Sequence, residues 1–199
     1  MAQFETNLSD MTSFYNEKEL YSLPFKSIGK NVLISKKASF YGISKISIGN
    51  NVRIDDFCIL SAGSGGIELG NYIHIAVFSL IQGEGKISIH DFVSISSRVS
   101  IYSSNDDYFG EHMSNPTLPV KYTGVTHADV TICQHVIIGS GSILLPGIIV
   151  NKGAAIGALS LVSDNCDEFY IYKGNPAKKL LKRSKKLLEI EKEFLASLP

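Results

Sequence analysis

The chain has 199 residues with 19 basic and 19 acidic side chains, so a net charge of zero argues against a polyanion-binding protein. Hydrophobic residues make up 44% of the sequence, enough for the core of one domain with a small appendage. No apolar run approaches the roughly 20 residues that span a bilayer. The first residues also lack the basic and apolar regions of a signal peptide. We therefore expect a cytoplasmic protein without a membrane span, whose three widely spaced cysteines are buried free thiols.

Residues 1–27 contain no regular repeat, and we predict that they form an N-terminal cap. The segment FYNEKELYSL, residues 14–23, reads as a short helix with Phe14, Leu20 and Leu23 as its apolar contacts. The end of a stack of strands exposes unpaired edges and core side chains. This short helix is well placed to cover that end.

From residue 28 onward, aliphatic or aromatic residues recur at intervals of six, with small and polar residues between them. Neither an amphipathic helix nor a simple strand has this period, whereas a solenoid with three flat sides uses about six residues per side. We predict an all-β fold, a parallel β-helix of about six coils over residues 28–175. The repeated positions are Ile28, Ile34, Phe40, Ile48, Ile54, Leu60, Leu69, Ile75, Ile81, Ile89, Ile95, Ile101, Ile132, Ile138, Leu144, Val150, Ile156 and Val162.

A long interruption separates Ile101 from Ile132, and we predict a loop over residues 102–131. A loop of this length in a compact repeat is uncommon unless it is functional or disordered. Its tyrosines, histidines and charged residues argue against disorder. We expect this loop to carry function.

After Val162 the six-residue period fades, and Gly174-Asn175-Pro176 breaks the chain. Proline is favoured at the first position of a helix. Beyond it, leucines and one phenylalanine recur at heptad spacing as far as Leu195. We predict an amphipathic C-terminal helix over 176–199 that packs on the solenoid or on a neighbouring subunit.

Two stretches carry a family resemblance: IIGSGSILLPGIIVNKGAAIGALSLVSDN at 137–165 and YKGNPAKKLLKR at 172–183. They resemble the hexapeptide-repeat acetyltransferases of the sugar O-acetyltransferase type, which include the maltose and galactoside acetyltransferases. The resemblance implies a left-handed β-helix, a homotrimer, and acetyl-CoA bound as acyl donor in the grooves between subunits. We further expect a saccharide or nucleotide-sugar acceptor and no metal.

The resemblance implies roles for four residues in binding the cofactor. Ser140 and Ala158 match positions that contact the pantetheine arm, and their spacing of 18 places them at one corner of successive coils. Ser163 matches a further cofactor contact, although a common lysine is replaced by Asp164 at the next position. Lys178, within GNPAK and a basic cluster, is expected to meet the phosphates of CoA.

The family's catalytic histidine is replaced by Asp106 in the string YSSNDDY. A sugar hydroxyl needs a general base because it is protonated at neutral pH, so the base is Asp106 itself, His112 or His127 by this interpretation. Glu84 matches the carboxylate that similar enzymes hold near the active histidine. His135, by contrast, lies in the middle of a hexad and is expected to point to solvent.

These residues are compatible with three functional hypotheses. The first is an acetyl-CoA-dependent O-acetyltransferase of surface-polysaccharide biosynthesis. The alternative is an N-acetyltransferase that acts on a nucleotide-linked amino sugar. A free amine with a pKa near 8 attacks without a strong base, which fits the missing histidine. A non-catalytic scaffold is the third hypothesis. A histidine metal site and nucleic-acid binding are both disfavoured, because the histidines are scattered and the net charge is zero.

Overall fold

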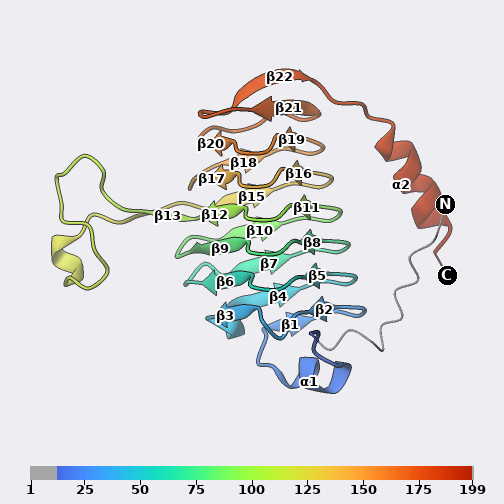
Figure 1. The fold of residues 1–199 in the computed structure, drawn as a ribbon, viewed down its shortest axis with the longest axis horizontal. Coiled ribbons are helices and arrows are strands. Elements are labelled where there is room, and N and C mark those ends of the chain that lie inside the picture. Colours follow the sequence, from blue (N-terminus) through green and yellow to red (C-terminus); the bar gives the residue numbers. More distant parts are fainter. Residues whose placement is uncertain (1–12, 199) are drawn as a thin grey trace.

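The structure, a computed structural model, describes residues 13–198 and forms a three-sided prism of stacked strands (Figure 1). The predicted N-terminal cap therefore lies partly outside the described residues, since residues 1–12 are not among them. Three parallel sheets form the faces of the prism, and the chain passes through all three in each coil. Six complete coils are present, so the predicted β-helix of about six coils is confirmed.

The strands of each face follow one another from the N-terminal to the C-terminal end of the prism. The first face contains β1 (Ser27–Ile28), β4 (Ile46–Ile48), β7 (Ile67–Leu69), β10 (Ile87–Ile89), β15 (Val130–Ile132) and β18 (Ile149–Val150). The second face contains β2 (Leu33–Ile34), β5 (Arg53–Ile54), β8 (His74–Ile75), β11 (Ser94–Ile95), β16 (Ile137–Ile138), β19 (Ala155–Ile156), β21 (Tyr170–Lys173) and β22 (Lys178–Lys182). The third face contains β3 (Ser39–Tyr41), β6 (Ile59–Ala62), β9 (Leu80–Gly83), β12 (Ser100–Tyr102), β17 (Ile143–Leu144) and β20 (Leu161–Val162).

The hexad residues fill the interior of the prism, as the period predicts. All are buried except Ile28 and Phe40, which belong to the first coil and are partly buried. Their register is that of the repeat, with Ile48 paired to Leu69 and Ile89 paired to Ile132 across the loop. Burial of about 25 cal/mol per Å² of apolar surface at every level makes this column the main source of stability.

Most corners of the prism place one residue in a left-handed backbone conformation. We call the turn between the first and second faces the first corner, and the turn between the second and third faces the second corner. Several of these residues are not glycine, with φ between 54° and 64°, which costs free energy that stacked side chains offset. They are Asn31, Asn51, Tyr72, Phe92, His135 and Phe169 at the first corner, and Phe57, Phe78, Arg98 and Leu159 at the second.

A short helix covers the N-terminal end of the prism, as predicted. Helix α1 (Glu17–Ser22) begins with a capping box, in which Asn16 and Glu19 each accept a hydrogen bond from the other's main-chain N–H at 2.9 Å. Its Leu20 is buried. Phe25, just after the helix, packs edge-on against Phe40 with ring centroids 5.1 Å apart. The 3-10 helix η2 (Ile43–Lys45) forms the turn that leads into the second coil.

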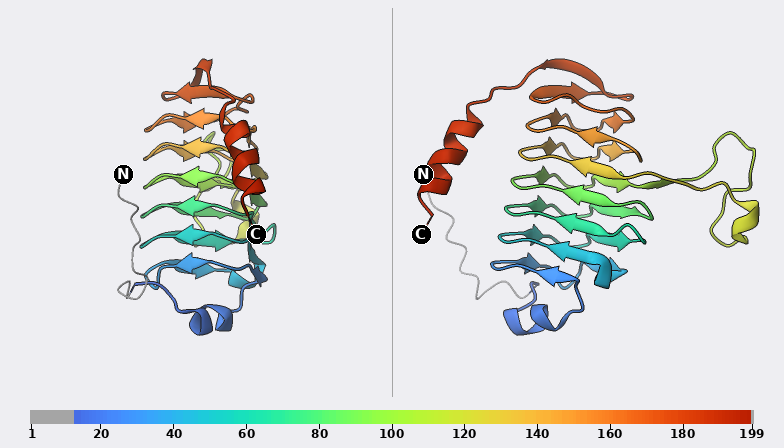
Figure 2. Two further views of the ribbon diagram at one scale, coloured as in Figure 1. Left: turned by 90° about the vertical axis from the view of Figure 1, so that its right-hand side faces the viewer. Right: turned by 180° about the vertical axis from the view of Figure 1, so that it is seen from behind.

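The long loop leaves the prism at the third corner, where the third face leads into the next coil. Its root is an antiparallel pair of β13 (Ser104–Asn105) and β14 (Thr126–His127), and it contains the 3-10 helix η3 (Val120–Tyr122). The loop projects sideways from the fourth coil, away from the side on which the C-terminal helix runs (Figures 1 and 2). The repeat resumes at β15 without a change of register.

The prediction of a helix beginning at Pro176 is wrong. Residues 178–182 form β22, which turns back antiparallel to β21 and covers the last coil, and α2 spans only Leu187–Ala196. The reason is the exposed edge of the last strand, whose main-chain groups bind a further strand before the chain can leave. Helix α2 then runs back along the outside of the coils (Figure 2). Its Phe194 packs edge-on against Tyr72 and Phe92. Neither α1 nor α2, the α-helices of the described residues, is long and apolar enough to cross a membrane.

The expectation that His135 points to solvent is also wrong. Its ring stacks on Phe92 with centroids 5.0 Å apart, its side chain is only 10% exposed, and Nε2 lies 3.0 Å from Glu191 of α2. The cysteines are free thiols, and Cys58 and Cys166 are buried as predicted, whereas Cys133 is half-buried.

Candidate functional site

A cavity of about 470 Å³ lies at the root of the long loop, where the loop leaves the third corner. It brings together three of the residues that the sequence singles out: Glu84 from the corner of the coil below, Asp106 after β13, and His127 on β14. The rest of its lining comes from the loop itself. These residues are Asn115, Pro116, Leu118, Val120, Thr123 and Val125. An apolar wall with two carboxylates and one imidazole is the composition of a small-molecule site.

The Ser104 side chain contacts both Glu84 and His127. Its hydroxyl accepts a hydrogen bond from the Glu84 main-chain N–H at 2.8 Å and lies 2.8 Å from Nδ1 of His127. A serine hydroxyl both donates and accepts hydrogen bonds, so this contact forms with Nδ1 either protonated or not. The serine thereby fixes the orientation of the His127 ring.

The Glu84 carboxylate is held in its ionised form. Hydrogen bonds from Ser64 lower the pKa of Glu84, and its Oε1 accepts the Ser64 main-chain N–H at 2.9 Å. The positive charges of Lys45 and His127 act in the same direction on this pKa. At neutral pH Glu84 is therefore negatively charged and has no proton to donate.

Asp106 lies between two hollows. One is the cavity at the loop root, and the other, of about 400 Å³, opens on the third face. The second hollow is lined on the loop side by Tyr108 and on the prism side by Tyr102, Ile143 and Leu161. The Asp106 side chain is exposed, so it is accessible from either hollow.

His112 does not reach this site. It lies farther along the loop, where its main-chain N–H donates to Asp107 at 2.6 Å and its Nδ1 lies 3.3 Å from the same carboxylate. Burial acts to raise the pKa of Asp107, but hydrogen bonds from the N–H groups of Phe109 and His112 outweigh it and lower the pKa. Asp107 and His112 thus hold the fold of the loop, and neither lines the cavity at its root.

Ser140 and Ala158 lie one above the other at the second corner, as their spacing predicts. The same column continues downward, because the Ser97 hydroxyl lies 3.3 Å from the Ser140 hydroxyl across adjacent coils. Lys178 begins β22 at the top of this corner and is exposed. Ser163 lies apart from these residues, after β20 at the third corner, where its hydroxyl bonds to Asp164 at 3.1 Å.

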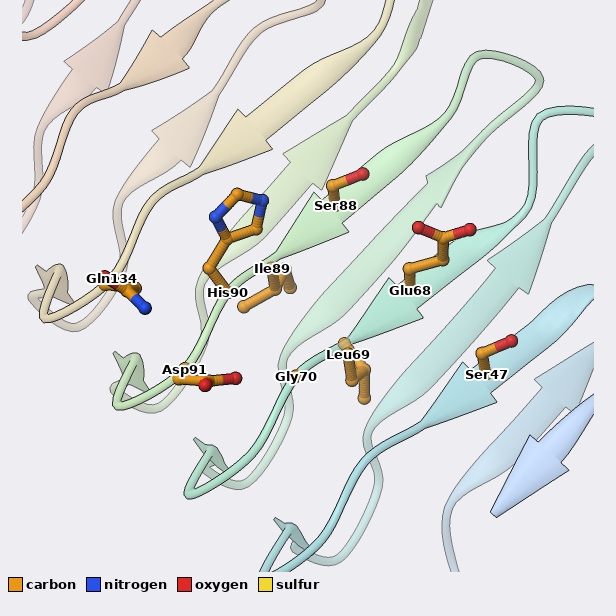
Figure 3. A pocket seen from close by; sticks show the side chains of 9 residues that line it. All are labelled: Ser47, Glu68, Leu69, Gly70, Ser88, Ile89, His90, Asp91 and Gln134. Atoms are coloured by element: carbon orange, nitrogen blue, oxygen red, sulfur yellow. The ribbon is translucent and has the colours of Figure 1, made fainter. Parts of the chain in front are cut away.

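A further shallow groove lies on the first face, across β4, β7, β10 and the turn after β15 (Figure 3). Its polar side chains belong to Ser47, Glu68, Ser88, His90, Asp91 and Gln134. None of the candidate residues lines it, and it is separated from the second corner by the width of a face. We therefore give it no part in the chemistry. Within residues 13–198, no group of three or more His, Cys, Asp or Glu residues is placed to hold a metal ion.

Sequence reasoning missed Ser104 and the continuation of the second corner through Ser97. Ser104 is one of several serines near Asp106, and only the pairing of β13 with β14 places it against His127. Ser97 was detectable in principle, because it stands in the same turn position as Ser140 once the loop is removed from the count.

Comparison with known proteins defines the class, and the chain belongs to the hexapeptide-repeat acyltransferases of left-handed β-helix fold. It is 57% identical over 185 residues to the dTDP-4-amino-4,6-dideoxy-D-glucose acyltransferase of Escherichia coli, covering 93% of this chain and 96% of that protein. It also resembles AntD, an N-acyltransferase from Bacillus cereus whose structure contains dTDP-4-amino-4,6-dideoxyglucose and coenzyme A. That likeness has a TM-score of 0.90 and 46% identity over 94% of this chain and 100% of AntD. No family model matches the chain.

A relative of the O-acetylating kind is more distant. The putative lipopolysaccharide biosynthesis O-acetyl transferase WbbJ of E. coli K12 is 30% identical over 117 residues, 58% of this chain and 57% of that protein. The chain is thus an acyltransferase, as the sequence predicts. Of the two reactions considered, the comparisons favour N-acylation over the O-acetyl transfer that the sequence analysis put first.

Proposed function

We propose that the chain transfers the acyl group of an acyl-CoA to the amino group of a dTDP-linked 4-amino-4,6-dideoxy sugar. The observation that carries this proposal is Asp106 at the mouth of the loop-root cavity, where a hydroxyl-activating member of the family would present a histidine. An amine of pKa near 8 is partly unprotonated at neutral pH and attacks a thioester directly. The relative at 57% identity bears the name of this reaction.

The acyl donor is acetyl-CoA or a close homologue, held along the second corner. Ser140 and Ala158 present small side chains in adjacent coils, so a pantetheine arm can lie against the backbone there. Lys178 lies at the top of the same corner, where it can bind a phosphate group of CoA. Ser163, at a different corner, contributes to this groove only from a neighbouring subunit.

The complete site needs more than one subunit. In one prism the second corner, with Ser140, and the third corner, with Asp106, are separated by the whole third face. At about 3.3 Å per residue a strand of three or four residues spans roughly 10–13 Å. We therefore infer a homotrimer in which the loop root of one subunit meets the second corner of the next, so that acyl donor and carboxylate share one groove.

The chemistry follows from the protonation of the groups at the loop root. Attack by the neutral amine on the thioester carbon forms a C–N bond and leaves a positively charged nitrogen in the intermediate. The Asp106 carboxylate accepts a proton from that nitrogen, and the thiolate of CoA leaves as the carbonyl re-forms. Glu84, kept ionised by Ser64, adds negative charge that favours the cationic nitrogen.

His127 is the observation that favours O-acylation as a second candidate. It is an imidazole in the same cavity, and an imidazole in its neutral form is a better base for a hydroxyl than a carboxylate of ordinary pKa. In the N-acylation proposal it instead binds the sugar through Nε2. The two functions therefore assign different importance to Asp106 and His127.

The test is release of CoA from acetyl-CoA with dTDP-4-amino-4,6-dideoxyglucose, the same sugar without its nucleotide, and a panel of neutral sugars. We expect turnover with the nucleotide-linked amine, no turnover with neutral sugars, and a loss of at least about 100-fold in kcat for Asp106→Asn, as for other general bases. His112→Ala, which lies outside the cavity, serves as the matched control and should keep its kcat. Turnover of neutral sugars and none of the amine would refute the N-acyl proposal.

A further inference from the structure

The second corner continues below the pantetheine positions as an exposed column of aromatic and cationic side chains. Phe57, Phe78 and Arg98 occupy the same turn position in three successive coils, with φ of 59°, 64° and 60°. The two phenyl rings stack at 5.1 Å with 10° between their planes. Phe57 is 48% exposed and Phe78 is 51% exposed, although both are large apolar side chains. We call Lys37, Phe57, Phe78 and Arg98 the second-corner column.

Cations lie at both ends of the stacked rings. The Arg98 guanidinium carbon is 5.8 Å from the centroid of Phe78, and Lys37 Nζ is 5.5 Å from the centroid of Phe57. Lys37 is paired with Asp56 at 2.8 Å, which compensates its charge. Among the ion pairs of residues 13–198, none includes Arg98. Arg98 therefore presents an uncompensated positive charge, and it does so next to Ser97.

The position of this column along the corner fits the far end of the acceptor. In the proposed function the CoA phosphates lie near Lys178 and the pantetheine arm runs along Ala158 and Ser140. The acyl group at the end of the arm is then directed down the corner toward the fourth coil. The Ser97–Ser140 contact shows that the corner is continuous there. The acceptor must then approach from the coils below, where Arg98 lies about 5 Å and Phe78 about 10 Å beneath Ser140, at roughly 4.8 Å per coil.

We propose that the second-corner column binds the nucleoside diphosphate part of the acceptor, an inference that rests on the proposed function. In such a substrate the reacting amine, the sugar ring, the diphosphate and the base follow one another in this order. Arg98 meets the diphosphate, because a guanidinium binds phosphate oxygens in pairs and holds its charge at all relevant pH values. The exposed edges of the Phe78 and Phe57 rings meet the base, since the positive edge of one aromatic ring is attracted to the face of another and the ring faces here are covered by each other and by the two cations. Arg98 is thus the residue that selects a nucleotide-linked sugar over a free one.

The direct test is binding of dTDP, measured by calorimetry in the absence of acyl-CoA. We expect Arg98→Ala to weaken dTDP binding at least about 10-fold, the effect of losing one charge-assisted phosphate contact. The dTDP affinity of Arg98→Lys should lie between those of the wild type and Arg98→Ala. CoA binding should be unchanged in both variants, which also reports that they fold. Lys30→Ala removes an exposed cation from the first corner of the first coil and is the matched control, with dTDP binding unchanged.

The phenylalanines supply a second, independent test that separates ligand binding from subunit assembly. Phe78→Leu should weaken dTDP binding several-fold while the sedimentation coefficient stays that of the wild type. If instead it dissociates the assembly and leaves dTDP affinity intact, the column is an intersubunit contact and the proposal is wrong.

The outcomes also separate this inference from the proposed function. Equal dTDP affinity in wild type and Arg98→Ala overturns the assignment of the column but leaves N-acylation standing. A wild-type protein that acylates the free amino sugar and does not bind dTDP overturns both, because the acceptor then carries no nucleotide.

Discussion

Ser104→Ala is the substitution that tests the loop-root site most sharply. It removes one hydroxyl that holds two partners, the Glu84 main-chain N–H and Nδ1 of His127, each at 2.8 Å. A neutral hydrogen bond contributes about 0.5–1.5 kcal/mol net to the free energy of unfolding. Because water can replace part of each bond at this half-buried position, we expect Ser104→Ala to lower the free energy of unfolding by about 1–2 kcal/mol. If His127 orients the acceptor, the transition state loses a similar amount of stabilisation and kcat/KM falls roughly 5- to 30-fold.

The assay is steady-state kinetics together with denaturant unfolding of the same preparation. Ser114→Ala, an exposed serine of the same loop, is the control and should match the wild type in both measurements. A Ser104→Ala variant that loses stability but keeps kcat/KM and its pH dependence would show that Ser104 only supports the hairpin. The reasoning that places His127 against the acceptor would then be refuted.

Two further predictions concern the C-terminal closure of the prism and the thiols. Arg183 donates from one guanidinium nitrogen to three main-chain carbonyls of the first corner, at 2.8, 3.0 and 3.3 Å. Arg183→Ala leaves these carbonyls without a charged donor and should lower the free energy of unfolding by about 2–3 kcal/mol, measured in urea, whereas Arg183→Lys should lose less. Burial raises the pKa of Cys58 to about 11 and that of Cys166 to about 12, so neither forms much thiolate at pH 8. A disulfide reagent should therefore modify only the half-buried Cys133 of the native protein at a measurable rate and all three thiols after unfolding, and fast modification of Cys58 would contradict the described burial.

The repeat was the part of the fold that sequence alone predicted best. A residue at every sixth position meets the same environment in each coil, so one pattern specifies strand, face and register together, as Ile89 and Ile132 show across the loop. The C-terminal prediction failed for the opposite reason. The leucines near Leu180 fit a helical pattern, but the exposed edge of β21 binds residues 178–182 as a strand, and a local pattern does not include that edge.

The candidate site was predicted in part. The sequence pointed to Glu84, Asp106 and His127, and in the structure all three line one cavity. His112 was an equal candidate by residue type, and it is excluded from the cavity only by its bonds to Asp107. Which loop residues meet depends on how the hairpin pairs, and no spacing in the loop determines that pairing.

The sequence by itself determined the prism, since a six-residue period of buried aliphatic side chains is satisfied only by a three-sided coil. It also determined the second corner, because a constant spacing of 18 places Ala158 directly above Ser140 whatever the rest of the chain does. Only the tertiary structure decided what lies beside them. The column of Phe57, Phe78 and Arg98 continues the same corner, although insertions in the turns and the loop break the spacing that would have revealed it. Periodic contacts are local and repeat along the chain, whereas the groups that meet a substrate come from different coils and are brought together by the stacking of the coils.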